Sequence, residues 1–510
     1  MSKKVCLVIP PSPFLLDERV FVSLGILKVA SSLVSGGVGV DVIDLSGVQN
    51  FEEAIAEYAS RSDVSWFGLT ATTPQMPAVY KILRRLRAVR KDVVVCLGGP
   101  HPTLVAAAVK SEKKRDVVGR AHSSFESTLK DFDIVVAGDG EDAIFAAVVL
   151  GQSSPGVYID ADDPKGKLFM SSVRYDETPF PARELVDMRS YHYTIEGKPS
   201  TSLIAQLGCP FQCTFCGGRA SPTLRRIRTR TTRSIIEELR QLYTVYGYTG
   251  FMFYDDELNV NKDMVNLMRS ISDLQSELGV DFRLRGFVKA ELFTDEQAAA
   301  MHAAGFRWLL TGFESGSPRI LENIVKKATR DDNTRAVEIA RRAGMKVKAL
   351  MSIGHAGESQ ETVDETRSWL LEVRPDDFDV TIITTYPGSP YYDDATKTSD
   401  DPPVWTYVSP KTGDRLHSYE LDYSVTADYY KGDPDGGYRS YVYTDFMTAE
   451  QLVVSRDAVE REVREKLSIP FNPGAPGLRY EHSMGQGLLP TNMLRSAEGA
   501  ILSRKHLTVV

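Results

Sequence analysis

The sequence is poor in cysteine and has no long apolar run. Five cysteines in 510 residues are too few for the disulfide framework of a secreted protein. No stretch approaches the roughly 18 apolar residues of a membrane span. The apolar run that begins at Val5 is stopped by Pro10 and Pro11, so it is shorter than the about 7–15 residues of a signal-peptide core. We therefore expect a soluble cytoplasmic protein with no membrane partner.

An excess of positive charge is also missing. The chain has 60 Lys and Arg against 68 Asp and Glu, which gives a net charge of −8. A nucleic-acid-binding protein would carry a basic domain or stripe, so we do not expect nucleic acid as a partner. Hydrophobic residues (42%) and charged residues (25%) are near globular averages, which excludes disorder of the whole chain. The length corresponds to about three domains of roughly 100–200 residues.

The first 150 residues alternate short apolar runs with amphipathic stretches. This pattern predicts a doubly wound parallel sheet, a Rossmann-like α/β domain over residues 1–150. Ligands of such sheets bind at the carboxyl ends of the strands, where small residues let them approach the backbone. The candidate contacts at these ends are Pro11, Ser12, Thr70, Thr72, Pro74, Gln75, Gly98, Gly99, His101, Gly138, Gly140 and Glu141.

Three further regions follow this domain. Residues 151–195 form a loop-rich connector, and residues 196–395 again alternate strands and helices, which predicts a partial (β/α)6 barrel with its site at the carboxyl ends of the strands. Residues 396–510 predict a small α+β C-terminal domain that caps the barrel, with a helix near 449–466. Its tyrosines either line a substrate cavity or pack as amphipathic aromatics. They are Tyr419, Tyr423, Tyr429, Tyr430, Tyr438, Tyr441 and Tyr443.

Three of the five cysteines form a CxxxCxxC pattern directly after the first predicted strand of the barrel. Thiolates of Cys209, Cys213 and Cys216 on one loop can hold one iron–sulfur cluster. Three ligands leave one iron of a four-iron cluster open, as in reactive metal centres. Zinc would need a fourth ligand, and no other His or Cys lies nearby in the sequence. The remaining Cys6 and Cys96 lie in predicted strands, where a thiol behaves as a small apolar group.

At this point the sequence resembles the radical S-adenosylmethionine (SAM) enzymes, in which three such cysteines hold a 4Fe-4S cluster whose open iron binds SAM. Residues 64–70, 97–103 and 135–141 resemble the cobalamin-binding domain that precedes many members of that family. The resemblance covers roughly residues 1–395. It implies a cobalamin-dependent radical SAM enzyme with a 4Fe-4S cluster, SAM and cobalamin as cofactors.

Further segments of the barrel resemble the family. They are the acidic segment 254–257, the Gly-x-Glu-x-Gly-Ser segment 312–317 and the segment 353–358, which has His355-Ala356 where the family usually has x-Pro. The resemblance assigns SAM contacts to Phe215, Asp255, Asp256, Glu257, Glu314 and Gly354. An acidic strand end can also serve as a helix cap, so a structural role stays open for each acidic residue.

The N-terminal domain departs from other cobalamin proteins in one respect. The Asp-x-His-x-x-Gly motif that supplies a histidine to cobalt is absent, and a histidine between two prolines, such as His101, is more often structural than a ligand. We therefore expect the benzimidazole tail to lie away from cobalt, with water, nothing or another side chain on the lower face.

Arginines gather after the cysteine motif. An RNA patch would need aromatic residues between them, so we prefer an anion-contacting or structural role. They are Arg219, Arg225, Arg226, Arg228, Arg230 and Arg233.

The resemblance implies a C-methyltransferase that acts on an unactivated carbon through a 5′-deoxyadenosyl radical and methylcobalamin. Two alternatives stay open: non-methylating radical chemistry (cyclisation, ring contraction or oxidation) and a cobalamin-binding sensor without turnover. Five cysteines cannot supply a second cluster, which excludes methylthiotransferases. We expect a small-molecule or peptide substrate and an electron donor such as flavodoxin or ferredoxin. The candidate substrate contacts are Tyr254, Arg285 and Tyr386.

Overall fold

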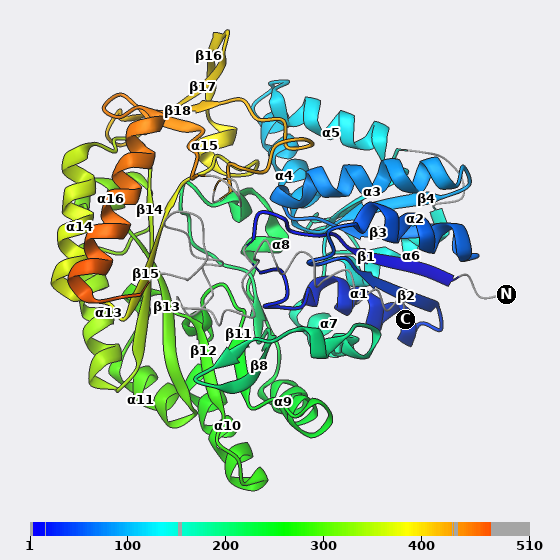
Figure 1. Ribbon diagram of the computed structural model, residues 1–510, viewed down its shortest axis with the longest axis horizontal. Coiled ribbons are helices and arrows are strands. Elements are labelled where there is room, and N and C mark those ends of the chain that lie inside the picture. The colour runs from blue at the N-terminus through cyan, green and yellow to red at the C-terminus, as the bar shows by residue number, and fades with distance from the viewer. Residues whose placement is uncertain (1–3, 16, 151–155, 431, 433–436, 471–510) are drawn as a thin grey trace.

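The computed structural model describes residues 4–15, 17–150, 156–430, 432 and 437–470. Figure 1 shows two α/β units side by side, the N-terminal unit in blue to cyan and a curved sheet with its helices in green to yellow. A C-terminal helix in orange lies on the outer face of the second unit. The α/β fold class expected from the sequence is confirmed.

The N-terminal unit is a six-stranded sheet in the order β2-β1-β3-β4-β5-β6, and all its pairings are parallel. Helices α1 and α6 pack together, as do α2 with α3 and α4 with α5. Strand β6 lies beyond residue 150, so this sheet takes its last strand from the expected connector. The strands are β1 (Lys4–Ile9), β2 (Gly39–Asp44), β3 (Trp66–Thr70), β4 (Val94–Gly98), β5 (Ile134–Gly138) and β6 (Val157–Ala161). The helices are α1 (Leu24–Ser35), α2 (Phe51–Arg61), α3 (Met76–Val89), α4 (Pro100–Lys114), α5 (Arg120–Asp131) and α6 (Gly140–Leu150).

The second unit is an open barrel of six parallel strands in the order β15-β14-β13-β12-β11-β8, with the short β7 antiparallel to β8 at one edge. The strands are β7 (Thr194–Ile195), β8 (Lys198–Leu203), β11 (Gly250–Phe253), β12 (Arg283–Phe287), β13 (Phe306–Glu314), β14 (Lys346–Ile353) and β15 (Asp377–Ile382). The outer helices are α9 (Thr232–Tyr246), α10 (Met264–Leu278), α11 (Asp295–Ala303), α13 (Arg330–Arg342) and α14 (Gln360–Val373). Short elements between them are α7 (Ser172–Glu177), β9 (Gln206–Leu207), α8 (Pro222–Arg225), β10 (Arg228–Thr229) and α12 (Pro318–Asn323).

The C-terminal segment forms an antiparallel sheet and one long helix. The sheet has the order β16-β17-β18-β19. The elements are α15 (Pro390–Asp393), β16 (Thr396–Asp400), β17 (Pro403–Val408), β18 (Arg415–Tyr419), β19 (Val442–Thr444) and α16 (Ala449–Leu467). Helix α16 packs against β15 and α14, so it takes the place of the sixth outer helix of the barrel.

Side chains of α16 close the free edge of β15. A Glu460 carboxylate oxygen accepts a hydrogen bond from the backbone N–H of Val380 at 2.7 Å, and Arg456 donates to the carbonyl of the same residue at 2.8 Å. Both side chains are buried. An edge strand presents unpaired backbone groups, and here a helix satisfies one N–H and two carbonyls of them, the second carbonyl being that of Phe378, which accepts from Arg464.

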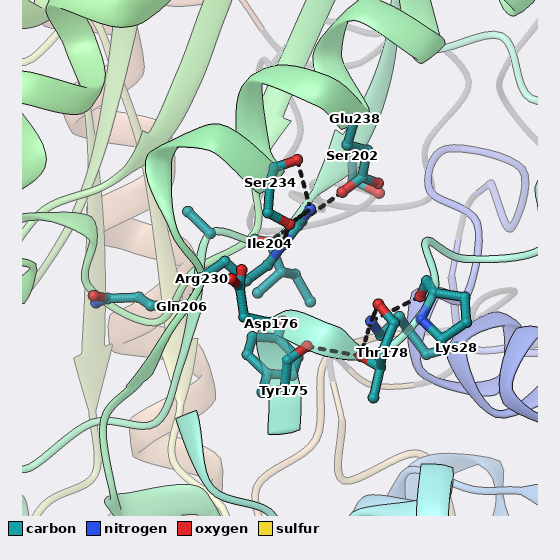
Figure 2. Close-up of polar contacts among 12 residues, drawn as sticks. Lys28, Tyr175, Asp176, Thr178, Ser202, Ile204, Gln206, Arg230, Ser234 and Glu238 are labelled. Atoms are coloured by element: carbon teal, nitrogen blue, oxygen red, sulfur yellow. Dashed lines mark hydrogen bonds and ion pairs between the residues drawn. The ribbon is translucent and has the colours of Figure 1, made fainter. Parts of the chain in front are cut away.

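A buried polar network joins the N-terminal unit, the connector and the barrel (Figure 2). Lys28 on α1 points toward the connector and donates to the carbonyls of Thr178 and Pro179 at 3.3 and 2.9 Å. Arg230 points toward α9, where it contacts the Glu238 carboxylate at 2.5 Å. Arg183 of the connector also donates to the Glu238 carboxylate at 2.7 Å, so the network links the N-terminal unit to the barrel through the connector.

Candidate active site

The cysteine pattern lies on a loop that follows β8 and β9. The loop begins at Gly208, whose φ of +88° is left-handed, and a Cβ there would lie 2.1 Å from the carbonyl oxygen of Arg226. Glycine is therefore required at this position. The N–H of Cys209 donates to the carbonyl of Leu224 at 3.0 Å, which ties the start of the loop to α8.

Two arginines brace the cysteine loop from outside. Arg225 donates to the carbonyl oxygens of Pro210 and Phe211 at 2.8 and 3.2 Å. Arg219 donates to the carbonyl of Gln212 at 3.0 Å. These bonds satisfy carbonyls that no regular element pairs, and they hold the loop in one shape.

The three thiols of the loop fit the ligand set of an iron–sulfur cluster. Burial raises the pKa of Cys209 to about 12, so a bound metal would have to displace its proton. Burial also raises the pKa of Cys213, although the nearby ammonium groups of Lys326 and Lys289 oppose this shift. No three His, Cys, Asp or Glu side chains of the described ranges gather around one point. A four-iron cluster does not require this, because each thiolate binds a different iron.

The three acidic residues after β11 lie in different environments. Asp255 is buried, and its carboxylate accepts hydrogen bonds from the backbone N–H groups of Ala205 (3.1 Å) and Gln206 (2.5 Å). It therefore shapes the strand end that leads to the cysteine loop. Asp256 is exposed. Glu257 lines the barrel cavity, and burial raises its pKa to about 7.

Glu314 has an unusual backbone conformation at the end of β13. Its φ is +65°, left-handed in a residue with a Cβ, at a bulge in the pairing with β14. Such backbone strain is concentrated at functional sites. One carboxylate oxygen lies 3.2 Å from the Lys326 ammonium, and the other accepts a hydrogen bond of 2.8 Å from the Ser352 hydroxyl. The side chain is thus held at the cavity wall from two sides.

A chain of hydrogen bonds extends from Glu314 to His355, and its directions follow from the partners. Ser352 donates to the carboxylate, so its oxygen accepts from Nε2–H of His355 at 2.8 Å. Nδ1 of His355 is then the acceptor for the Tyr391 hydroxyl at 3.3 Å, whose oxygen accepts from the N–H of Ala356 at 3.4 Å. Burial lowers the pKa of His355 to about 4, which is consistent with a neutral ring.

His355 also contacts the aromatic residue of the cysteine loop. The rings of Phe215 and His355 meet at 5.4 Å in an edge-to-face arrangement. The preceding residue, Gly354, has a φ of +88°, and a Cβ there would lie 3.2 Å from Val442 of β19. The segment from Gly354 to His355 therefore connects the cysteine loop, Glu314 and the C-terminal sheet.

The open barrel contains a cavity of about 360 Å³. Phe215, Glu257, Glu314, Lys326 and Ser352 line its cysteine-loop end. The other residues that line it are Phe287, Gly312, Leu350, Met351, Asp379, Thr381, Ile382, Ile383, Thr384, Tyr386, Tyr429, Tyr430 and Tyr438.

Of the three candidate substrate contacts, Tyr386 lines this cavity and the other two lie elsewhere. Tyr254 packs its ring against Phe21 at 5.5 Å. Arg285 is buried, donates to the Tyr193 hydroxyl at 3.3 Å and lies over the ring of Trp308. In this arrangement Tyr254 and Arg285 contribute to packing at the β7 side of the barrel.

The expected cobalamin contacts meet at the carboxyl edge of the N-terminal sheet. Gln75 donates to the carbonyl of Pro10 and to the hydroxyl of Ser12, both at 3.0 Å, and its side-chain oxygen accepts from the N–H of Thr72 at 2.9 Å. The loops after β1 and β3 are thereby joined. Pro11 lies in the first loop, and Pro74 lies in the short 3-10 turn of the second.

Glycines keep side chains away from this edge of the sheet. Gly99 has a φ of +94°, and a Cβ there would lie 2.5 Å from the Thr70 hydroxyl. A Cβ on Gly138 would lie 2.5 Å from the carbonyl carbon of Ala161. Nothing lies within 4 Å of the Cβ position of Gly98, so this strand end is open. An open edge with hydroxyl and amide groups fits the binding of a large polar cofactor.

Three of the candidates are buried or packed against neighbouring residues. A Cβ on Gly140 would meet Val29 at 2.7 Å, so Gly140 allows α6 to pack against α1. Glu141 is buried, and burial raises its pKa to about 7. His101 is also buried, with Nδ1 3.2 Å from the Thr73 hydroxyl and its ring against Tyr423. His101 thus has partners within the protein, and its role toward cobalamin stays a prediction.

The arginines after the cysteine motif form internal contacts. Arg228 is buried and pairs with Asp139 at the end of β5, while Arg230 pairs with Glu238. With the two bracing arginines described above, this arrangement agrees with the structural role preferred from the sequence.

Sequence reasoning missed Lys326 and Ser352. Lys326 follows α12, and Ser352 lies on β14, where a serine in a strand gives no chemical signal. The one hint in the sequence was His355, which precedes the alanine that stands in place of the family's proline, because a histidine needs partners for two ring nitrogens.

The comparisons with known proteins agree with this geometry. Residues 203–370 match the radical SAM superfamily, and residues 18–129 match the B12-binding domain. An uncharacterized methyltransferase of Pyrococcus horikoshii is 29% identical over 401 residues, 76% of this chain and 82% of the relative. An anaerobic magnesium-protoporphyrin IX monomethyl ester cyclase of Rubrivivax gelatinosus is 24% identical and covers 71% of this chain, which spans 64% of that cyclase.

Solved structures support the same fold. The radical SAM methyltransferase TsrM from Kitasatospora setae, with cobalamin and a [4Fe-4S] cluster bound, superposes with a TM-score of 0.63 at 18% identity, over 90% of this chain and 91% of that one. The chain is thus a two-unit α/β protein with a cluster-binding loop. More specifically, it combines a B12-binding domain with a radical SAM domain, and the resemblance to cobalamin-dependent radical SAM enzymes is confirmed. Its cofactors are a 4Fe-4S cluster, SAM and cobalamin. No described helix is long and apolar enough to cross a membrane.

Proposed function

We propose that the protein is a cobalamin-dependent radical SAM C-methyltransferase that methylates an unactivated carbon. This proposal rests on one observation: a single cavity extends from the cysteine loop toward the N-terminal unit. Phe215 of the cysteine loop lines one part of it, and Tyr430, whose ring packs on Phe14 of the N-terminal unit at 5.2 Å, lines another. A substrate in this cavity can approach both cofactor sites, which radical formation and methyl delivery at one carbon require.

When bound, the cluster, SAM and cobalamin supply hydrogen-atom abstraction and methyl transfer. The chain's own residues would bind these groups and orient them. Cys209, Cys213 and Cys216 would hold the cluster. The Glu314 carboxylate, fixed by Lys326 and Ser352, retains lone pairs for donors of SAM.

We infer three further properties from the same site. The substrate is a small molecule or a peptide side chain that enters the cavity. A one-electron donor such as flavodoxin or ferredoxin approaches the cysteine loop, because Cys216 is exposed. The protein works in the cytoplasm, where thiols stay reduced.

The test is anaerobic incubation of the reconstituted protein with SAM bearing a deuterated methyl group, cobalamin, a reductant and candidate substrates. We expect 5′-deoxyadenosine and S-adenosylhomocysteine in equal amounts, with the label in the product. Cys213→Ala should abolish 5′-deoxyadenosine. Formation of 5′-deoxyadenosine and product without the label would contradict methyl transfer.

Non-methylating radical chemistry is the second candidate function. The similarity to a cyclase over 71% of this chain supports it. The same assay separates the two. A sensor without turnover would bind cobalamin and leave SAM intact.

A further inference from the structure

Tyrosines from two distant segments form one half of the barrel cavity. Tyr386 follows β15, and Tyr429, Tyr430 and Tyr438 come from the segment between β18 and β19. The rings of Tyr386 and Tyr429 meet at 6.1 Å with an interplanar angle of 73°. Aromatic rings prefer edge-to-face or offset contacts with other aromatic rings, so this wall favours a planar aromatic ligand over an aliphatic one.

Other tyrosines of the C-terminal segment stay outside the cavity. Tyr423 packs its ring on Tyr429 at 5.4 Å and donates its hydroxyl to the carbonyl of Thr385 at 2.8 Å. Tyr443 stacks on His417 at 4.7 Å in the antiparallel sheet. Some tyrosines of this segment therefore line the cavity, and others pack as amphipathic aromatics.

Tyr429 has a hydroxyl without a partner. The residue is 2% exposed, and its Oη makes no hydrogen bond within the described part of the chain. Its backbone carbonyl accepts from the Thr384 hydroxyl at 3.3 Å, which fixes the residue at the cavity wall. A buried hydroxyl without a partner is destabilising, and a ligand atom that accepts its hydrogen bond removes this cost.

The charges around the cavity disfavour an anionic ligand. Among its described lining residues, Lys326 is the only cation, and it is paired with Glu314 at the opposite end. Asp379 lies in the wall of the tyrosine half. The nearby Arg456, whose guanidinium lies over the Tyr438 ring, is already bound to Glu460 and the Val380 carbonyl. A carboxylate or phosphate placed there would lose its hydration without gaining a counter-charge from the lining residues.

We infer that the substrate places in this half of the cavity a planar aromatic or heteroaromatic group that carries no negative charge and accepts a hydrogen bond from the Tyr429 hydroxyl. This inference rests on the proposed function only in identifying the occupant as the substrate.

Isothermal titration calorimetry of the full-length, cluster-containing protein at pH 7 tests the inference with three matched probes. They are 2-naphthol, which is planar and neutral; 2-naphthoate, which is planar and anionic; and trans-decalin-2-ol, which is neutral but saturated. We expect 2-naphthol to bind most tightly, the decalinol more weakly and the naphthoate least. Tyr429→Phe keeps the ring and removes one hydrogen bond, so it should weaken 2-naphthol about threefold to tenfold.

Tyr443→Phe is the matched control, because that ring lies in the sheet, and its affinity should equal that of the wild type. Near-ultraviolet circular dichroism of Tyr429→Phe verifies that the variant is folded. Equal affinity for the naphthol and the naphthoate, no measurable binding of 2-naphthol, or an unchanged affinity in Tyr429→Phe would overturn the inference. Binding requires no turnover, so a failure of methyl transfer in the previous assay leaves this result unaffected, and the reverse also holds.

Discussion

The carboxylate of Glu238 pairs with two buried cations. Its carboxylate oxygens lie 2.7 Å from Arg183 and 2.5 Å from Arg230, and all three side chains are buried. Burial would raise the pKa of Glu238, but the two guanidinium groups bring it below its usual value. Its contribution to stability is therefore present above the pKa of the unfolded state and is lost as the pH falls through the lower, folded value.

We predict that Glu238→Gln destabilises the protein by about 3–5 kcal/mol, because it leaves buried charges without a partner. Urea unfolding at pH 7 measures this. Glu237→Gln is the neighbouring control: Glu237 pairs with the exposed Arg233, and its change should stay within about 0.5 kcal/mol. Similar losses in both variants would contradict a special role for the buried pair.

His101 gives a prediction for acid sensitivity. Burial lowers its pKa from the usual 6.5 to about 4, so the unfolded chain takes up a proton before the folded protein does. Stability then falls as the pH decreases from about 6.5 to 4. Between pH 7 and pH 5, His101 alone should account for about 2 kcal/mol of this loss. His101→Gln should flatten the dependence of the unfolding free energy on pH by that amount; an unchanged slope would show that the ring is protonated in the folded state.

The chain from Tyr391 to Glu314 predicts a graded effect on SAM binding. His355→Phe keeps a ring beside Phe215 but leaves the Ser352 oxygen without its donor, so we expect SAM affinity to fall about threefold to tenfold. Tyr391→Phe breaks only the two bonds of its hydroxyl, which are distant from Glu314, and should change SAM affinity less than about twofold. Equilibrium dialysis of the cluster-containing variants measures affinity without turnover. Nitrogen-15 spectra of labelled histidine should show a protonated Nε2 and a bare Nδ1; the opposite tautomer would rule out this chain.

At the scale of elements, the cysteine loop depends on one turn. In Gly208→Ala the new Cβ would meet the carbonyl of Arg226, so the loop must shift. We predict that this variant retains its fold but binds less than half of the wild-type iron after reconstitution. Gly247→Ala is the control, because Gly247 also has a left-handed φ, of +76°, but open space around it. Equal iron contents in the two variants would show that the loop tolerates the shift.

Elements differ in how far the sequence could predict them. The alternation of apolar runs predicted both parallel sheets, because each strand signal is local in the chain. Helix α16 was also predicted by its period, but not its position over β15, since that depends on Glu460 and Arg456 meeting a strand about 80 residues away. In the site, the cysteines were visible through their spacing. Lys326 and Ser352 were not, because only the folded barrel brings them to Glu314.

At the scale of the whole molecule, the two units share a buried charge pair. Arg228 of the barrel has a side chain that is 3% exposed, and it pairs with Asp139 at the end of β5. The units also meet at a second point. The buried Asp162, after β6, accepts hydrogen bonds from the Ser221 hydroxyl at 2.6 Å and the Thr223 N–H at 2.8 Å. The carboxyl edge of the N-terminal sheet is thereby fixed against the cysteine-loop side of the barrel.

This junction predicts cooperative unfolding. We expect one calorimetric transition for the wild type, because neither unit can unfold without exposing these buried groups. Asp139→Asn leaves Arg228 buried and unpaired, at a cost of about 3 kcal/mol or more, and should separate the transition into two. Asp142→Asn is the control. Asp142 lies in α6, three residues after Asp139, and pairs with the exposed Arg174, so its loss should leave one transition. Two transitions in the wild type would mean that the units are thermodynamically independent, and the alignment of the two cofactor sites would then have to come from the bound cofactors rather than from the chain.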